Sequence, residues 1–417
     1  MMQKNLLFGL TFGSVIILAF FFHALQGKPP LIHIKGAAIG PLVYNESHQL
    51  PVNDSDGFKN SSAHMVESFN MLGYLLMNDT TKLKKIYAEL FETFPTSFSP
   101  RFKNPCWFNK RSKLRCLPYF YQIGMPKCGT TDLWNKLIKH PQIQNVPKEP
   151  HWWAKRRNGW TQTPIHAPQV LRVRHMTGKE DDASLEWYLN WFEAFAVQDI
   201  KKNHKLVFGD GSVTTSFTPL GHWRTDFPGA KDPPVSLPDL MHSLQPEAKI
   251  IVILREPVSR FYSAHLYNGG RNSRSFDRAV KDSLECMATC LSRHTDRFCA
   301  YQQTCDQIFR GMYSIYMTDW IKAYGHDKVH VIRLDEWVTT PIEEYKKLLK
   351  FLEIDMLSNN TIKSIVEQKV QNSQKKKMKK AGEMLPSSRK LLEDFYRPYN
   401  RALAELLNDT NFLWDYG

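Results

Sequence analysis

The chain has 417 residues, of which 42% are hydrophobic, and this is enough to bury one large core with a small additional segment. Its formal net charge of +14 favours polyanionic partners such as nucleic acid, anionic lipid or acidic polysaccharide. The sequence contains no helix-turn-helix, zinc-finger or RNA-binding signature, so we expect no nucleic-acid partner.

The N-terminal region contains an uncharged, mainly apolar run at residues 6–22, which Ala24 and Leu25 nearly extend. Roughly 17–25 such residues span a bilayer. A cleaved signal peptide is the alternative, but its apolar region is usually about 7–15 residues long, and no clean small-x-small cleavage site follows here. We therefore predict a cytoplasmic tail at 1–5 and an uncleaved transmembrane signal anchor at 6–25.

Glycosylation acceptors indicate on which side of the membrane the rest of the chain lies. The N-x-[ST] pattern occurs at Asn45, Asn53, Asn60, Asn78, Asn359 and Asn408. Four of the six lie just after the predicted anchor in a polar stretch, which favours a lumenal stem. We predict a type II membrane protein of the secretory pathway, with a stem at 26–104 and one lumenal α/β domain at 105–417.

Seven cysteines fit a lumenal compartment, where six of them could pair. Cys106 and Cys116 are close in sequence and could form one bridge. Cys128 is the expected unpaired cysteine. The remaining four, at positions 286, 290, 299 and 305, allow three pairings that sequence does not distinguish.

A strand, a glycine-containing loop and a helix start follow one another at residues 119–138. Residues 119–123 form an aromatic and β-branched run typical of a buried strand, and the loop from Gly124 to Gly129 contains one cation, Lys127. A helix is predicted from Thr130. Glycines, free N–H groups at a helix start and a lysine together can bind an oxyanion. An ordinary turn between strand and helix is the alternative.

The order of residues in this loop distinguishes two kinds of phosphate site. Nucleotide triphosphatases place the lysine after the second glycine, with a magnesium-binding hydroxyl beside it, whereas Lys127 here precedes Gly129. The string P-K-C-G-T-T resembles instead the 5′-phosphosulfate loop of sulfotransferases that use 3′-phosphoadenosine 5′-phosphosulfate (PAPS). That resemblance implies donor binding by residues 127–131 (Lys127, Cys128, Gly129, Thr130, Thr131), and the loop requires no metal.

The segment at 146–153 contains charged, imidazole and indole side chains, and its two prolines keep it out of a helix. A solvated Lys148–Glu149 pair beside core tryptophans is one interpretation. The other is a base near an acceptor hydroxyl. The string resembles K-E-x-H-F-F of heparan-type sulfotransferases, which implies Glu149 as the catalytic base with Lys148 beside it. His151, Trp152 and Arg156 are then the expected acceptor contacts.

A further strand is predicted to end in polar residues. Residues 205–212 end in Asp210 and Ser212, which are candidate acceptor contacts because carboxyl ends of strands face the ligand crevice in open α/β sheets. An Asx turn is the alternative for Asp210. Heparan-type relatives have E-K-[ST] at this place, and this chain lacks the lysine.

Residues 248–254 form the clearest buried strand, and Pro257 suits the first turn of a helix that follows it. Arg255 and Ser263 resemble the R-x-P-x-x-R-x-x-S pattern that grips the 3′-phosphate of PAPS. A guanidinium offers a bidentate grip for such a phosphate. An arginine that caps its own sheet is the alternative.

The C-terminal half is predicted to complete the domain. Residues 271–301 form a polar, cysteine-rich excursion over the cleft, a helix begins at 311, a strand covers 328–334 and a helix covers 342–352. The charge run at 374–382 precedes a last helix. A resemblance to sulfotransferases with a basic loop there implies that Lys379 and Lys380 close over the 3′-phosphate.

Together these strings, in order over residues 115–414, resemble the Golgi carbohydrate sulfotransferases. The resemblance implies an α/β, P-loop-like sulfotransferase fold with a central, mainly parallel sheet flanked by helices. It also implies PAPS as co-substrate, the Golgi membrane as location and a glycosaminoglycan acceptor, at the 6-hydroxyl of N-acetylgalactosamine 4-sulfate in chondroitin or dermatan sulfate. Open alternatives are a heparan sulfate or other glycan acceptor, a phosphoryl-transfer enzyme and a catalytically silent glycosaminoglycan-binding membrane protein.

Overall fold

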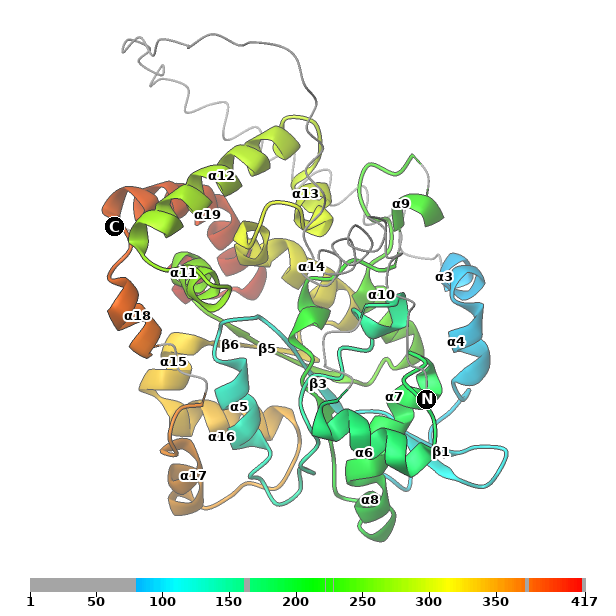
Figure 1. Ribbon diagram of the computed structural model, residues 1–417. Helices are drawn as coiled ribbons and strands as arrows, with labels where there is room; N and C mark the ends of the chain where they lie inside the picture. Colours follow the sequence, from blue (N-terminus) through cyan, green and yellow to red (C-terminus); the bar gives the residue numbers. More distant parts are fainter. Residues whose placement is uncertain (1–79, 161–165, 222, 228, 372–374, 415–417) are drawn as a thin grey trace, which may run out of the picture. The chain divides into compact units, whose positions relative to one another are not determined.

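The computed structural model describes residues 80–160, 166–221, 223–227, 229–371 and 375–414 (Figure 1). All of them belong to one compact unit, Phe69–Gly417. The predicted anchor at 6–25 and most of the predicted stem at 26–104 lie outside the described residues. Within these ranges the structure contains no helix whose length and apolar character would allow it to cross a bilayer.

The centre of the unit is a four-stranded parallel sheet with strand order β4-β3-β5-β6. The strands are β3 (Phe120–Gly124), β4 (Gly209–Asp210), β5 (Lys249–Leu254) and β6 (Val329–Arg333). The expected parallel sheet is therefore confirmed. The strand expected over 205–212 is only two residues long, because Val207 hydrogen-bonds to Gln142 and Gln144 instead of to β3.

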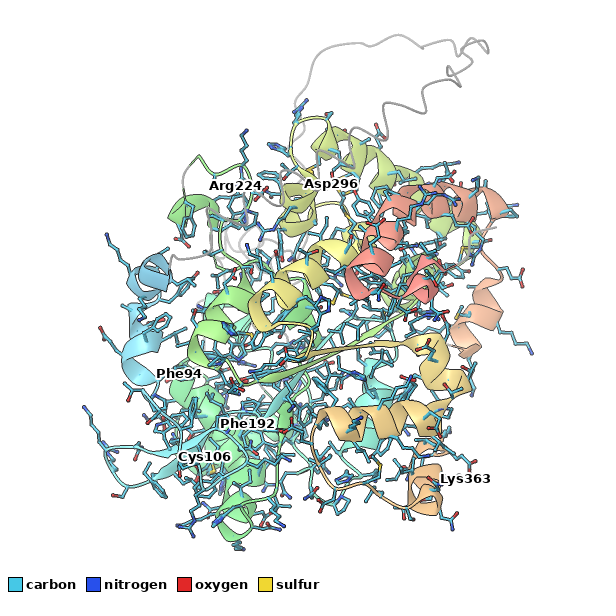
Figure 2. The ribbon with its side chains drawn as sticks, turned by 180° about the vertical axis from the view of Figure 1, so that it is seen from behind. Phe94, Cys106, Phe192, Arg224, Asp296 and Lys363 are labelled. Atoms are coloured by element: carbon cyan, nitrogen blue, oxygen red, sulfur yellow. A yellow bond between two sulfur atoms is a disulfide. The ribbon has the colours of Figure 1, made fainter. Side chains whose placement is uncertain are left out.

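Helices cover both faces of the sheet. In Figure 1, α10 (Leu237–Leu244) and α14 (Tyr313–Tyr324) lie above it, and α5 (Thr130–Leu137) and α16 (Pro341–Phe351) lie below it. All five residues of β3 and all but the first of β5 are buried, as expected for strands covered on both sides. Tyr313, Tyr316 and Trp320 of α14 are buried, and so are Tyr345, Leu348 and Leu349 of α16. Figure 2 shows the side chains of the unit, with Phe94 and Phe192 labelled.

The remaining elements surround this centre. Before β5 they are α3 (Thr80–Ile86), α4 (Ala88–Thr93), β1 (Cys106–Phe108), β2 (Leu114–Cys116), η1 (Arg156–Asn158), α6 (Pro168–Thr177), α7 (Leu185–Phe192), η2 (Glu193–Val197), α8 (Gln198–Lys202), η3 (Val213–Ser216) and α9 (Trp223–Asp226). After β5 they are α11 (Pro257–Tyr267), α12 (Ser273–Leu291), α13 (Asp296–Gln302), η4 (Ile308–Gly311), α15 (Leu334–Thr339), α17 (Asn359–Val366), α18 (Lys375–Ala381), α19 (Pro386–Leu407) and η5 (Thr410–Leu413).

Helices α3 and α4 come from the end of the predicted stem. Leu83 and Leu90 on them, and Phe94 just beyond, are buried in the same hydrophobic core as the sheet. The core of the compact unit therefore begins before residue 105.

Three disulfides are present among the described residues. Cys106–Cys116 joins β1 to β2 and confirms the expected local bridge. Cys286–Cys305 and Cys290–Cys299 settle the pairing that the sequence left open. Cys128 is unpaired and buried, as expected.

A buried carboxylate fixes the helix that follows the first loop. Asp132, in the first turn of α5, forms an ion pair with Lys136 at 2.8 Å and accepts a hydrogen bond from Nε1 of Trp337 at 3.0 Å. It also accepts a bond from the backbone N–H of Gln371 at 3.2 Å. Asp132 thus connects α5 to α15 and to the segment before α18.

We expect Asp132→Ala to lower the free energy of unfolding by about 3–5 kcal/mol, because it leaves the Lys136 ammonium buried without its partner. Urea unfolding measures the change. The matched control is Asp199→Ala on α8, where the carboxylate is exposed and lies 4.0 Å from Lys202. An equal effect of the two substitutions would contradict this account of α5.

Candidate active site

The loop after β3 and the residue after β5 lie at the same edge of the sheet, since parallel strands end on the same side. The backbone N–H of Met125 donates to the carbonyl of Ile253 at 2.9 Å, which ties the loop to β5. Gly129 directly precedes α5 and has a φ of 85°, and a Cβ there would lie 2.8 Å from a methyl of Leu334. Glycine is therefore required at this position both by its backbone conformation and by the space available.

Arg255 lies between the end of β5 and the start of α11. Glu256 caps that helix, with its carboxylate accepting hydrogen bonds from the N–H groups of Val258 and Ser259. The Tyr313 hydroxyl donates to the Arg255 carbonyl at 2.8 Å and lies 3.7 Å from Sγ of Cys128. Helix α14 thus holds the two predicted donor-binding segments together.

Lys127 is half-buried among other positive charges. Burial, and then the charges of Lys377 and Arg255, lower the pKa of the Lys127 ammonium to about 8. The cation of the first loop therefore lies within electrostatic reach of the cation that follows β5. Such crowding of like charges is unfavourable in the absence of an anion and favours an anion between the charges.

An exposed aromatic ring also contributes to this cluster. Nζ of Lys127 lies 3.7 Å from the ring centroid of Tyr267 at the end of α11, and Nζ of Lys377 lies 5.8 Å from the same ring. The α18 lysine that reaches the loop is therefore Lys377. None of the contacts within the described residues joins Lys379 or Lys380 to it. A run of lysines has no internal spacing that singles out one member, and no sequence pattern points to Tyr267.

Glu149 forms a charged group with its sequence neighbours. Its carboxylate accepts a hydrogen bond from Nζ of Lys148 at 2.7 Å and lies 3.5 Å from Nε2 of His151. Burial alone would raise the pKa of Glu149, but the hydrogen bond from His151 and the Lys148 charge lower it to about 2. The carboxylate is therefore ionised at neutral pH and able to accept a hydrogen bond from a hydroxyl.

Contacts between segments bring Glu149 to the first loop. Nζ of Lys148 donates to Oγ1 of Thr130 at 3.2 Å, and the Glu149 charge acts on Lys127. The backbone N–H of His151 donates to Oγ of Ser212 at 2.9 Å, which adds the segment after β4. The segments that follow β3, β4 and β5 therefore lie in one region together with residues 148–151.

Backbone strain is concentrated in the same region. Lys127, Glu149 and His151 have φ values of 71°, 69° and 51°, and they are three of the ten described non-glycine residues with positive φ. Such conformations cost free energy and persist at sites where the surrounding contacts hold them.

Four of the residues predicted to contact the acceptor are buried, namely Trp152, Arg156, Asp210 and Ser212. Trp152 is buried, stacks on Tyr188 and donates to the carbonyl of Ala183. Arg156 is buried in an ion pair with Asp181. Both therefore lie in the core rather than on a surface that an acceptor could reach.

Asp210 and Ser212 are also buried, and they shape the turn after β4. Asp210 accepts hydrogen bonds from the Tyr188 hydroxyl at 2.7 Å and from the N–H of Ser212 at 2.9 Å, which makes an Asx turn. The sequence allows Asp210 to be either an acceptor contact or part of an Asx turn, and these contacts favour the turn. Ser212 supports His151 through its hydroxyl.

A cation cluster and an ionised carboxylate side by side can bind a polyanion and accept a proton next to it. Among the residues that the structure describes, no group of three or more His, Cys, Asp or Glu side chains is arranged to hold a metal ion.

Comparison with known proteins identifies the class. The model of the sulfotransferase family matches residues 118–358, which is more than half of the chain, and the protein belongs to that family and is a sulfotransferase enzyme. PAPS is the sulfate donor that this family implies. The matched segment includes Lys127, Glu149, Arg255 and Ser263.

The chain is also similar to individual sulfotransferases whose names state a class of substrate. Carbohydrate sulfotransferase 15 from Rattus norvegicus and that from Homo sapiens are each 28% identical over 400 residues, covering 81% of this chain and 69% of theirs. A bifunctional heparan sulfate N-deacetylase/N-sulfotransferase from Drosophila melanogaster is 25% identical, covering 76% of this chain and 29% of its own. A solved sulfotransferase from Alicyclobacillus acidocaldarius is 22% identical with a TM-score of 0.44, covering 70% and 97% of the two chains. The family assignment rests on the family model and not on this last likeness.

We expect Lys377→Ala to raise the pKa of Lys127 from about 8 toward the ordinary lysine value of about 10.4, because removal of a neighbouring cation favours the protonated ammonium. NMR titration of ¹³C-methylated lysines measures this, with Lys127→Arg assigning the signal. The control is Lys390→Ala on α19, whose ammonium pairs with Asp394. An unchanged midpoint in Lys377→Ala would show that the two charges do not interact.

Proposed function

We propose that this enzyme transfers a sulfuryl group from PAPS to a sugar hydroxyl of a glycosaminoglycan. The acceptor that we propose is the 6-hydroxyl of N-acetylgalactosamine 4-sulfate in chondroitin or dermatan sulfate. The observation that carries the proposal is the cluster of Lys127, Arg255 and Lys377 at the edge of the sheet, with ionised Glu149 beside it.

The residues present fit a nucleotide that is charged at both ends. Lys127 with residues 128–131 would hold the 5′-phosphosulfate, and Arg255 with Ser263 would hold the 3′-phosphate. Like-charge repulsion between Lys127 and its neighbours is relieved when anions lie between them, which favours such a ligand over a singly charged one. Lys377 takes the closing role that the sequence suggested for Lys379 and Lys380.

PAPS supplies the sulfuryl group and a leaving phosphate. Glu149 would accept the proton of the attacking sugar hydroxyl, and its two neighbours Lys148 and His151 keep the carboxylate ionised and oriented for that role. Lys127 would stabilise negative charge that grows on the leaving phosphate oxygen, and Lys148 would stay close through Thr130.

A glycosaminoglycan acceptor is supported by charge and by the relatives. The formal net charge of +14 attracts acidic polysaccharides, and the attraction weakens as salt is added. The relatives named above include carbohydrate and heparan sulfate enzymes. The strings at 126–133, 148–153 and 255–263 resemble those of enzymes that act on N-acetylgalactosamine 4-sulfate.

We also propose that the enzyme is held in the Golgi membrane as a type II protein, with a tail at 1–5, an anchor at 6–25, a stem that ends before α3 and a catalytic domain that faces the lumen. The apolar run and the sequons between 45 and 78 support this topology. The three disulfides fit an oxidising compartment.

We expect Glu149→Gln to lower kcat by about 10²–10⁴-fold, the usual contribution of a general base. Binding of 3′-phosphoadenosine 5′-phosphate should stay near normal, because that ligand does not need the base. Turnover with radiolabelled PAPS and calorimetric titration measure the two quantities. The control is Glu405→Gln, an exposed carboxylate on α19. Surviving turnover in Glu149→Gln would show that Glu149 is not the base.

The acceptor is tested with radiolabelled PAPS on chondroitin, dermatan and heparan sulfates, followed by disaccharide analysis. The proposal predicts label at the 6-hydroxyl of N-acetylgalactosamine 4-sulfate. Label on heparan sulfate alone would replace the acceptor but keep the reaction class. No label on any acceptor, with glycosaminoglycan binding intact, would favour the catalytically silent alternative.

A further inference from the structure

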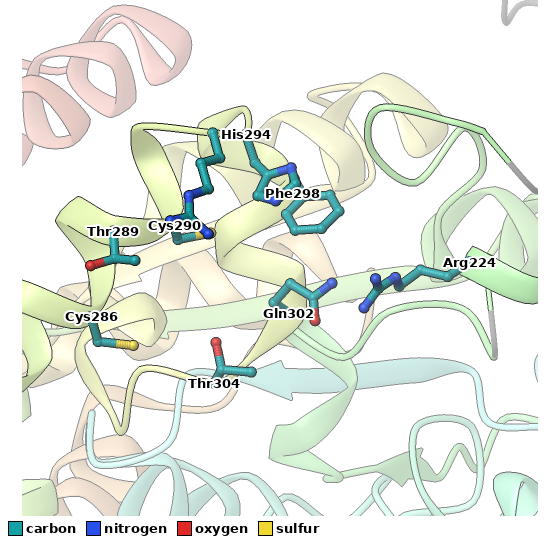
Figure 3. Close-up of a pocket in the computed structure, with 9 residues that line it drawn as sticks. Arg224, Cys286, Thr289, Cys290, His294, Phe298, Gln302 and Thr304 are labelled. Atoms are coloured by element: carbon teal, nitrogen blue, oxygen red, sulfur yellow. The ribbon is translucent and has the colours of Figure 1, made fainter. Parts of the chain in front are cut away.

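A pocket of about 320 Å³ lies between α9, α12 and α13 (Figure 3). Its volume is at the lower end of ligand pockets, which are about 300–1,000 Å³, and suits a unit of one or two sugar rings. None of the motifs described above contributes a side chain to it. Its floor includes Cys286 and Cys290, each of which is fixed by a disulfide.

The charged groups of this pocket are all basic. Arg224 and Arg293 line it, and within the described residues neither guanidinium has a carboxylate partner. Arg224 extends from α9 toward the α13 side of the pocket, where Gln302 lies (Figure 3). No carboxylate is among the described lining residues. Two guanidinium groups that line one pocket without a carboxylate partner favour a bound anion.

Two carboxylates beside the pocket are already engaged. Asp232 pairs with Arg297 at 3.2 Å and accepts a hydrogen bond from Thr295. Asp296 accepts a hydrogen bond from the hydroxyl of Tyr399 at 3.0 Å. Neither forms an ion pair with Arg224 or Arg293.

The exposed imidazole ring of His294 in the wall adds a surface suited to a sugar, and the Phe298 ring beneath it is buried. The His294 ring stacks on Phe298 with centroids 3.9 Å apart, and the Arg224 guanidinium lies 5.7 Å from the same phenyl ring. Gln302, Thr289 and Thr304 add polar groups around the opening. Guanidinium donors for an acid group, together with a ring surface beside them, suit a sulfated or uronic sugar better than a bare inorganic ion.

The wall of this pocket is connected to the segment that supports the candidate active site. Gln303, next to Gln302, donates from Nε2 to the carbonyl of Phe217 at 3.0 Å. Phe217 directly follows η3, which begins one residue after Ser212. The wall of the pocket and the segment after β4 are therefore in direct contact.

We propose that the pocket between α9, α12 and α13 binds an acidic sugar residue of the glycosaminoglycan, away from the residue that receives the sulfuryl group. This inference rests on the proposed function for its choice of ligand. It makes the enzyme favour long acceptor chains over short ones, because only a long chain occupies both sites.

The test uses the full chain with Arg224→Ala and Arg293→Ala combined. Both side chains are exposed, so the fold should persist. The KM for polymeric chondroitin sulfate should rise about tenfold, from the loss of two charge-assisted contacts. The KM for a chondroitin tetrasaccharide and the KM for PAPS should not change. The matched control combines Arg278→Ala and Arg401→Ala, which removes the same charge from exposed positions on α12 and α19.

A second measurement separates this inference from the proposed reaction. Fluorescence anisotropy of a labelled long chondroitin sulfate chain, without PAPS, should show the same weakening in the pocket variant and not in the control. If no transfer occurs at all, the proposed function fails while this binding result still decides the pocket. Equal affinities of pocket variant and control would overturn the inference. Competition by inorganic sulfate as strong as that by a sulfated disaccharide would also overturn it.

Discussion

The structure depends on one electrostatic constraint, which is the crowding of positive charge where β3 and β5 end. Parallel strands place the loop of Lys127 and the guanidinium-bearing Arg255 at the same edge, and α18 adds Lys377. Burial and these neighbours lower the pKa of Lys127 to about 8. Repulsion of this kind is relieved when an anion lies between the charges, which is why we propose this place as the binding site of the doubly charged donor.

The scaffold maintains this crowding through buried polar contacts that have no role in the chemistry. Asp132 joins α5 to Trp337, and Tyr313 joins Cys128 to the Arg255 backbone. Each contact joins segments distant in sequence, so the geometry of the site is set by the fold and not by the loop alone. Their burial gives each hydrogen bond a high cost of loss, which keeps the site in a single arrangement.

Local sequence signals were sufficient for the centre of the fold. Apolar runs predicted β3, β5 and β6, and the glycine loop predicted the start of α5 at Thr130, because these features depend on neighbouring residues alone. Long-range contacts explain what was missed. Trp152 and Arg156 looked like acceptor contacts, but α7 and the segment before it bury them, and nothing near them in sequence predicts that. Lys377 likewise could not be told from the lysines beside it.

The most direct test of the central claim compares ligands that carry one or both phosphates. Calorimetry would measure 3′-phosphoadenosine 5′-phosphate and adenosine 5′-phosphate on the parent chain, on Arg255→Ala and on Lys127→Ala. If Lys127 and Arg255 hold opposite ends of one nucleotide, Arg255→Ala weakens binding of only the ligand with a 3′-phosphate. Lys127→Ala then weakens binding of both ligands by a similar factor. If Arg255→Ala weakens both equally, or neither, the two cations do not hold opposite ends of one nucleotide.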